Sequence, residues 1–188
     1  MSLIQSFESL GADLRALRKS RGLTLTDVAE QLGRSVGWMS QVERDMSQPT
    51  MPELKHLADV LGVSVSTFFG RSPALPGEEG IIVRKDARRP IGHRAQGLSE
   101  ELLSPDLTDD FEVIHSVFRA NTERKTPVKR DTQEIGYIVT GELELTINGA
   151  VYSLTPGDSF RIRGEAYCWA NRTQSPCVAI WIIAPPVY

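Results

Sequence analysis

The chain has 188 residues, of which 40% are hydrophobic and 24% charged, and its formal net charge is −3 at pH 7. This composition is ordinary for a globular protein, and the length allows one large or two small domains. No apolar run is long enough to span a bilayer, and the N-terminal segment lacks the basic start and apolar core of a signal peptide. We therefore expect a cytoplasmic protein with no membrane partner.

The net negative charge argues against a simple nucleic-acid binder, because affinity for DNA comes largely from cations placed on phosphates. A local basic stripe would be enough for a dimeric DNA-binding protein. The first segment carries such residues: Arg15, Arg18, Lys19, Arg21, Arg34 and Arg44. Solvated helix faces are the alternative explanation for several of them. Cys168 and Cys177 lack a Cys-x-x-Cys spacing, and we expect both to be reduced packing residues.

The first third of the chain has the apolar periodicity of short helices. The pattern over residues 6–20 predicts a first helix, which Gly22 ends. Thr24 is expected to cap a second helix, and Asp27, three residues on, gives this start a near capping-box form. Gly33 is expected to stop the second helix.

The next helices are predicted from their caps. Ser35 is expected to cap a third helix, which turns Met39 inward. Thr50 and Glu53 form a capping box for a fourth helix. A short fifth helix over residues 64–69 would complete an all-α five-helix bundle, the expected first domain, over residues 1–70.

Residues 70–80, GRSPALPGEEG, are rich in glycine and proline, and we expect residues 71–80 to be a linker. In the second domain, residues 81–188, the sequence pattern changes from helical spacing to short β-type runs. These are Ile81–Arg84, Leu98–Leu103, Phe111–Phe118, Ile135–Val139, Glu142–Ile147, Ala150–Leu154, Ser159–Ile162, Tyr167–Ala170 and Val178–Ile183. Asn148-Gly149 between two runs is a strong hairpin signal, and many short strands predict an all-β sandwich or barrel.

Residues 11–69 follow a known pattern in order and spacing. The matching features are Leu14, Arg15, Leu17, Arg18, Gly22-Leu23-Thr24, Ala29, Gly33, Ser35, Ser40, Glu43-Arg44, Pro49, Leu54, Leu57-Ala58 and Leu61-Gly62-Val63. With these features the segment resembles the helix-turn-helix domain of the XRE family, which includes the lambda-type phage repressors. The family usually has glycine where this chain has Asp45, a residue that tolerates a left-handed turn.

The resemblance implies a lambda-repressor-like DNA-binding domain whose third helix enters the major groove of double-stranded DNA. The candidate DNA-binding residues are Thr24, Thr26, Ser35, Val36, Gly37, Trp38, Ser40, Gln41 and Arg44. Gln41 can pair with adenine, whereas Val36 and Trp38 suit thymine methyl groups. Trp38 has an alternative role as a cover for the bundle core. A module that binds only protein is disfavoured by the polar start of this helix.

Two further implications of the resemblance concern roles within the helical domain. Arg18 and Glu43 match family positions that pair with each other inside the bundle, so we expect them to be structural. Thr24, Thr26 and Ser40 suit contacts to phosphates, which position the protein without reading sequence.

Residues 126–183 resemble the cupin fold, an all-β double-stranded β-helix or jelly-roll barrel. Glu134 lies seven positions before Gly141, as in the cupin pattern, and Pro156-Gly157-Asp158 and Asn171 mark its second part. The metal-binding histidines of that pattern fall at Val128, Arg130 and Tyr167. Valine has no donor atom and arginine is a permanent cation, so only Glu134 remains of a site that needs about three protein ligands. We expect no metal and no other cofactor.

An arginine at a ligand position has two interpretations. Arg130 and Glu134 could form a satisfied ion pair, or they could hold a small zwitterion or carboxylate. In the second case the candidate ligand-binding residues are Arg130, Glu134, Tyr137, Tyr167 and Trp169. The sequence is compatible with both interpretations.

The fusion of the two resemblances implies a transcriptional regulator. We expect a repressor that binds a two-fold operator as a homodimer, with the barrel as the sensor and dimerisation domain. A small effector, such as an amino acid, an amine or a carboxylate, would control it. The alternative is a cupin-type non-haem metal oxygenase or epoxidase, whose facial triad needs two histidines that this chain lacks. We therefore expect no enzyme activity.

Overall fold

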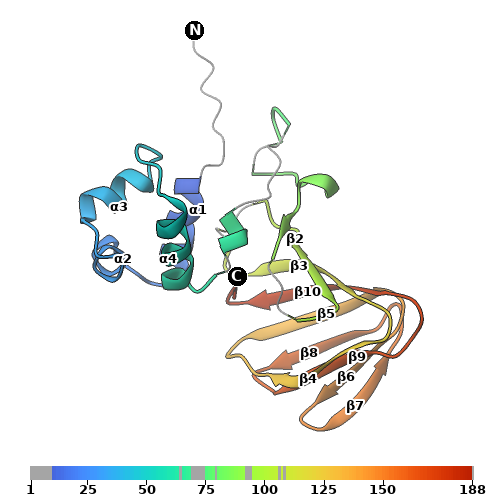
Figure 1. Ribbon diagram of the computed structural model, residues 1–188. Helices are drawn as coiled ribbons and strands as arrows, with labels where there is room; N and C mark the ends of the chain where they lie inside the picture. The colour runs from blue at the N-terminus through green and yellow to red at the C-terminus, as the bar shows by residue number, and fades with distance from the viewer. Residues whose placement is uncertain are drawn as a thin grey trace. The chain divides into compact units, whose positions relative to one another are not determined.

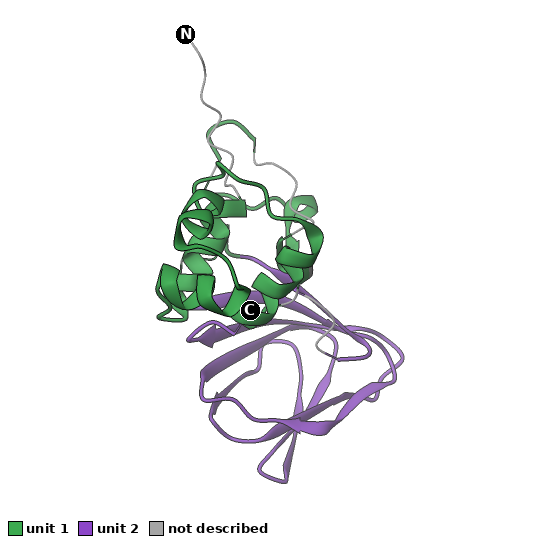
Figure 2. Cartoon of the chain, turned by 60° about the vertical axis from the view of Figure 1, so that its left-hand side comes forward, with its two compact units in different colours: residues 1–89, 104–110, 188 green, residues 90–103, 111–187 purple. Residues whose placement is uncertain are grey.

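The computed structural model describes residues 10–63, 65–68, 75–78, 80–91, 95–105, 107 and 109–187. The chain forms two compact units (Figure 2). The helical unit comprises residues 1–89, 104–110 and 188, and the β unit comprises residues 90–103 and 111–187. The expected order of a helical region followed by a β-rich, cupin-like region is confirmed (Figure 1). None of the described helices has the length and apolarity needed to cross a lipid bilayer.

The described part of the helical unit has four α-helices, so the prediction of five is wrong. They are α1 (Leu10–Ser20), α2 (Leu25–Leu32), α3 (Val36–Val42) and α4 (Met51–Leu61). In place of a fifth helix, Val65–Phe68 forms η1, a 3-10 turn, and Lys85–Ala87 forms a second one, η2. Gly62 ends α4 in the left-handed region at φ 67°, and four residues are too few for an α-helix to be stable. Residues 6–9 and parts of the expected linker, residues 71–74 and 79, lie outside the described residues.

The caps of α2 and α3 form as their sequences predict. The Thr24 hydroxyl accepts the Asp27 backbone N–H (3.1 Å), and the Asp27 carboxylate accepts the Thr24 backbone N–H (2.7 Å). The Thr24 hydroxyl and the Thr24 backbone N–H, which both donate to the carboxylate, hold the pKa of Asp27 below its usual range. Gly33 takes a left-handed conformation (φ 62°), and the Ser35 hydroxyl accepts the Trp38 backbone N–H (3.1 Å). The turn between α2 and α3 is therefore fixed at both ends.

The apolar stripes of the four helices meet in one core. Its buried residues are Leu14, Leu17, Val28, Ala29, Met39, Val42, Leu54, Leu57, Ala58 and Leu61. The expected pairing of Arg18 with Glu43 is confirmed, because both guanidinium nitrogens Nε and Nη2 donate to the carboxylate, at 2.6 and 3.0 Å. This two-point ion pair ties the end of α3 to α1.

Gly11 allows α1 to approach the end of α3. Its N–H donates to Asp45 Oδ1 (3.0 Å), and Asp45 takes a left-handed conformation at φ 55°. A Cβ at Gly11 would lie 2.5 Å from the Val42 carbonyl oxygen and 2.8 Å from the Glu43 backbone. Only glycine therefore fits this crossing without movement of the backbone.

We predict that Gly11→Ala lowers the free energy of unfolding by about 1–3 kcal/mol, the usual cost of overpacking. Gly37→Ala is the matched control, because a Cβ at Gly37 meets no atom closer than 3.9 Å. The control should gain roughly 0.5–1 kcal/mol from its helical propensity. Urea denaturation followed by circular dichroism measures both. Equal stability of the two variants would contradict the close approach of α1 and α3.

The β unit contains two antiparallel sheets. The larger has the order β1-β2-β3-β10-β5-β8, and the smaller has the order β4-β9-β6-β7. The strands are β1 (Arg89–Pro90), β2 (Leu98–Leu102), β3 (Glu112–Phe118), β4 (Thr122–Val128), β5 (Gln133–Thr140), β6 (Leu143–Ile147), β7 (Ala150–Leu154), β8 (Ser159–Arg163), β9 (Tyr167–Asn171) and β10 (Cys177–Ala184). Figure 1 shows the two sheets facing each other.

Two strand predictions need correction. Ile81–Arg84 is not a strand: Ile81 and Ile82 are 75% and 41% exposed, so no partner covers them. The sequence prediction also missed β4, whose residues TERKTPV look polar and contain a proline. β4 is an edge strand of the smaller sheet, where charged residues and proline are tolerated.

The two cysteines are free, as expected from their spacing. Cys177 is buried, and burial raises the pKa of its thiol to about 11. Cys168 donates to the Lys125 carbonyl oxygen (3.3 Å). Both residues pack against neighbouring strands.

Candidate functional site

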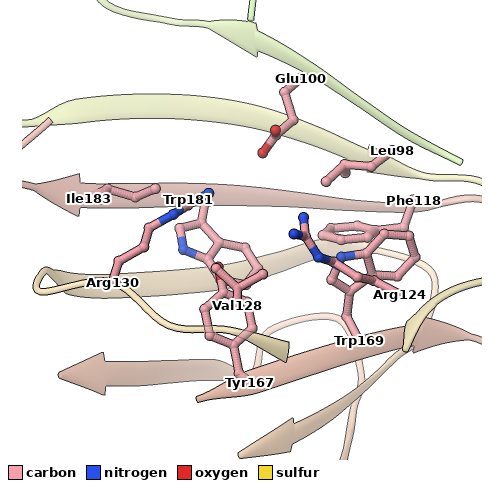
Figure 3. Close-up of a pocket in the computed structure, with 10 residues that line it drawn as sticks. All are labelled: Leu98, Glu100, Phe118, Arg124, Val128, Arg130, Tyr167, Trp169, Trp181 and Ile183. Atoms are coloured by element: carbon pink, nitrogen blue, oxygen red, sulfur yellow. The ribbon is translucent and has the colours of Figure 1, made fainter. Parts of the chain in front are cut away.

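A cavity lies between the two sheets of the β unit (Figure 3). Strands β2, β3, β4, β9 and β10 and the loop after β4 supply its walls. The lining residues are Leu98, Glu100, Phe118, Arg124, Val128, Arg130, Tyr167, Trp169, Trp181 and Ile183. The cavity has a volume of about 20 Å³, which is room for roughly one water molecule. A larger occupant must displace side chains on the open side, where Arg130 is 23% exposed.

Glu134, beside this cavity, is the centre of a buried hydrogen-bond network. Its side chain is 1% exposed, and Oε1 accepts the Thr132 hydroxyl (2.8 Å). Oε2 accepts the indole N–H of Trp181 (2.7 Å) and the hydroxyl of Tyr167 (3.2 Å). Three donors from three parts of the barrel therefore hold one carboxylate in place.

The aromatic residues pack on one another around this network. Tyr167 stacks on Trp181 at 5.7 Å between ring centroids, and Phe118 meets the edge of Trp169 at 4.8 Å. Burial raises the pKa of Tyr167, and the negative charge of Glu134 raises it further. Tyr167 therefore stays a neutral hydrogen-bond donor at physiological pH.

The charged side chains of the cavity lie on facing walls. Arg130 Nη1 lies 3.9 Å from Glu134 Oε1, which is too long for a hydrogen bond. Figure 3 shows Arg130 extending toward Trp181 and Glu100 pointing inward from the opposite wall. The Ser116 hydroxyl donates to Glu100 (3.3 Å), and Arg124 Nε donates to the Thr126 carbonyl oxygen (3.2 Å). The cavity thus presents cationic and anionic groups together.

The structure places four of the five candidate ligand-binding residues around this cavity and excludes the fifth. Arg130, Tyr167 and Trp169 line it, and Glu134 bonds to its wall. Tyr137 is a correction: it is 48% exposed on the outward side of β5. Successive side chains of a strand alternate between faces, and Tyr137 lies three positions from the inward Glu134.

The sequence prediction missed several lining residues. Glu100, Arg124 and Trp181 come from strands outside the local motif around Glu134. For Trp181 a signal existed, because it lies two positions from both Ala179 and Ile183 and so shares the buried face of β10 with them. Arg124 lies on the missed strand β4, so no pattern pointed to it.

The residues at the cupin metal positions do not fit a metal ion. Val128 offers no donor atom, and the guanidinium of Arg130 is a cation without a lone pair to share. The remaining carboxylate, Glu134, already accepts three hydrogen bonds. Within the part of the chain that the structure describes, no three His, Cys, Asp or Glu residues gather to hold a metal. His93 lies outside the described residues.

The second candidate surface is on α2 and α3. Thr26, Val36, Gly37, Gln41 and Arg44 are exposed there, with Val36 at 42%. The hydroxyls of Thr24 and Ser35 are used in helix caps. Ser40 is half-buried, and its carbonyl oxygen accepts Arg44 Nε (3.1 Å).

The position of Trp38 fits both of its candidate roles, a cover for the bundle core and a reader of base edges. It is half-buried, and the guanidinium of Arg34 lies 5.5 Å from the centre of its ring. Arg34 also pairs with Glu53 at 2.5 Å, so a cation between α2 and α3 holds the indole from outside.

Comparisons with known proteins agree with both halves of this geometry. A helix-turn-helix domain model matches residues 9–67, and a cupin domain model matches residues 117–183. The HTH-type transcriptional regulator PuuR of Escherichia coli (strain K12) is 30% identical over 182 residues, which cover 95% of this chain and 96% of PuuR. The chain belongs to the HTH-type transcriptional regulators. SutR, another regulator of this type from the same organism, is 26% identical over 162 residues, or 83% of each chain.

A solved structure of an HTH_3 family transcriptional regulator from Vibrio cholerae has 24% identity to this HTH-type regulator and a TM-score of 0.45. The match covers 95% of this chain and 96% of that one. The two domain models and the match to PuuR confirm the expected resemblance to XRE-type helix-turn-helix proteins with a cupin domain. The protein is a DNA-binding transcriptional regulator.

Proposed function

We propose that this regulator is a cytoplasmic repressor that binds a two-fold operator as a homodimer and responds to a small carboxylate in its barrel. Residues 1–70 are the DNA-binding domain, residues 71–80 a linker, and residues 81–188 the sensor and dimerisation domain. The observation that carries the sensor role is the buried network of Glu134 beside a cavity that Arg130 lines. Binding can shift DNA affinity only as far as the effector prefers one state of the protein.

The DNA-binding half of the proposal rests on the exposed start of α3. The readers of base edges are Val36, Gly37, Trp38 and Gln41, with Gln41 suited to a two-point contact with adenine. Thr24, Thr26, Ser35, Ser40 and Arg44 surround them and suit contacts to the sugar–phosphate backbone. Fixed caps at Thr24 and Ser35 support this role because they hold α2 and α3 in one orientation.

The cavity favours a carboxylate-bearing effector over an amine. Both oxygens of Glu134 are already occupied by donors, so this carboxylate has little capacity left for an ammonium group. Arg130 has no hydrogen bond to Glu134, and its planar fork suits a carboxylate. Glu100 on the opposite wall suits an amino group at the other end of the molecule. An amino acid carries both a carboxylate for Arg130 and an amino group for Glu100, so it is the class of effector that matches the cavity.

Binding in the barrel is proposed to be recognition without catalysis. Oxygenase or epoxidase chemistry in a cupin needs a facial triad of two histidines and a carboxylate. This chain has Val128 and Arg130 at the two histidine positions. Arg130 and Tyr167 then serve as binding groups.

Isothermal titration of the purified chain with free amino acids, short dicarboxylates and diamines tests the effector class. We expect at least one carboxylate to bind and the diamines not to bind. Arg130→Gln should weaken that binding by about tenfold or more, since a hydrogen bond to a charged group contributes roughly 1.5–3 kcal/mol. Arg172→Gln, at an arginine that is 61% exposed on the surface, is the control and should bind normally. Binding of a diamine alone would contradict the proposal.

A further inference from the structure

The larger sheet of the β unit has an apolar outward side. This outer face consists of Val113, His115 and Val117 on β3, Val178, Ile180 and Ile182 on β10, and Ile135, Tyr137 and Val139 on β5. Ile135 is 50% exposed, Tyr137 48%, Val139 42% and Ile182 38%. Large side chains are this exposed on the adjacent strands β5 and β10, and the half-buried outer residues of β3 continue the patch, which is typical of an interaction surface.

The strand register aligns this patch in rows across the sheet. Val113, Ile182 and Ile135 form one row, because β10 pairs Ile182 with both of the others. His115, Ile180 and Tyr137 form the next row in the same way. A flat array of rows can pack against an identical array with aligned strands, as in sandwiches of two sheets.

We propose that a second copy of this chain covers the outer face, which makes it the dimer interface. This inference rests on the homodimer of the proposed function and names the surface that forms it. The argument for a copy of the same chain is the charge at the two edges of the face. A two-fold interface uses the same patch on both subunits, so its charges must be complementary to themselves.

The outer face carries opposite charges at its two edges. Arg161 on β8 is exposed beside Ile135, to which it is paired in the register. At the other edge Glu101 on β2 is paired with His115 and is 44% exposed. Glu165, whose carboxylate accepts the Arg163 backbone N–H, lies near Arg161 and is held by that backbone contact. The charged side chain that extends outward at the β8 edge is therefore Arg161, not Glu165.

The charges select one orientation of the two-fold axis. An axis parallel to the strands along β10 places β8 of one copy over β2 of its partner, and Arg161 then faces the partner's Glu101. An axis across the strands would place β8 over β8 and bring like charges together, which is unfavourable. In the favoured arrangement β5 lies over the partner's β3, so Tyr137 packs near the partner's His115. The outward position of Tyr137 thus has a role in dimerisation.

Sedimentation equilibrium of the full chain tests this interface. We expect the wild type to have twice the chain mass of 20.8 kDa. Tyr137→Glu should raise the dimer dissociation constant by about tenfold or more, because it buries a charge at a central aromatic position. Tyr152→Glu is the matched control: Tyr152 is 52% exposed on β7 and should leave the dimer unchanged.

A charge exchange tests the orientation. Arg161→Glu alone and Glu101→Arg alone should each weaken the dimer, and the double variant should recover most of the affinity.

The Tyr137 variant distinguishes this proposal from the proposed function. If Tyr137→Glu left the dimer unchanged, the outer face would not be the interface, and the homodimer would form through another surface. A monomeric wild type would refute both, and a lower melting temperature for Tyr137→Glu would then mean that another part of the same chain covers the face. If Tyr137→Glu weakened the dimer but the double variant of Arg161 and Glu101 did not recover the affinity, the proposed axis would be refuted.

Discussion

Replacing Glu134 with leucine is expected to lower the free energy of unfolding of the β unit by about 3–5 kcal/mol. The substitution removes the acceptor for Tyr167, Trp181 and Thr132 and leaves the Arg130 charge without its carboxylate neighbour. Buried donors that lose their acceptor keep the full cost of desolvation. Urea denaturation followed by tryptophan fluorescence measures the change, since Trp181 is part of the network.

Two variants control this result. Glu142→Leu replaces an exposed glutamate of the same unit and should change stability by less than about 0.5 kcal/mol. Glu134→Gln keeps the shape and one acceptor oxygen, so it should retain part of the stability and remains measurable if the leucine variant does not fold. If Glu134→Leu were as stable as the wild type, Glu134 would not be the centre of the network.

Val36→Glu is expected to reduce operator affinity by about a hundredfold or more without loss of stability. Val36 is 42% exposed at the start of α3, so a glutamate fits there, and its charge would enter the negative potential of the DNA groove in which Val36 is proposed to contact base edges. Juxtaposed like charges cost several kcal/mol in an interface. The measurement is a fluorescence anisotropy titration with a duplex that the wild-type protein selects from a random library.

Val151→Glu is the control for this DNA-binding prediction. It makes the same substitution at a valine that is 59% exposed on β7, in the other unit, and it should bind the duplex like the wild type. Both variants have the same net charge, so a difference between them reports the position of the charge. Equal affinities would exclude the start of α3 from the DNA interface.

The helical unit was largely predictable because its signals are local. Thr24, Ser35 and Gly33 determine where α2 and α3 begin and end through contacts within a few residues. The fifth helix predicted over residues 64–69 does not form, because Gly62 ends α4 and only the four-residue turn Val65–Phe68 follows. A segment this short is a weak signal for a terminal helix.

The cavity was only partly predictable because its walls come from distant segments. Arg130 and Tyr167 were found through positions relative to Glu134 and Asn171, whereas Arg124 and Glu100 need the strand pairing of the whole barrel. The error at Tyr137 was avoidable, since an odd separation from Glu134 places a side chain on the opposite face of a strand. β4 was missed because an edge strand has little apolar alternation.

Operator binding in the presence of a chelator tests the central claim that a metal-free barrel controls DNA affinity. The wild-type chain, dialysed against EDTA, is titrated with the selected duplex, with and without each carboxylate that binds in the calorimeter. We predict that at least one of them raises the dissociation constant for the duplex about tenfold or more, and that Arg130→Gln abolishes this response. A response that appears only when a transition metal is restored, or that is unchanged in Arg130→Gln, would contradict the account.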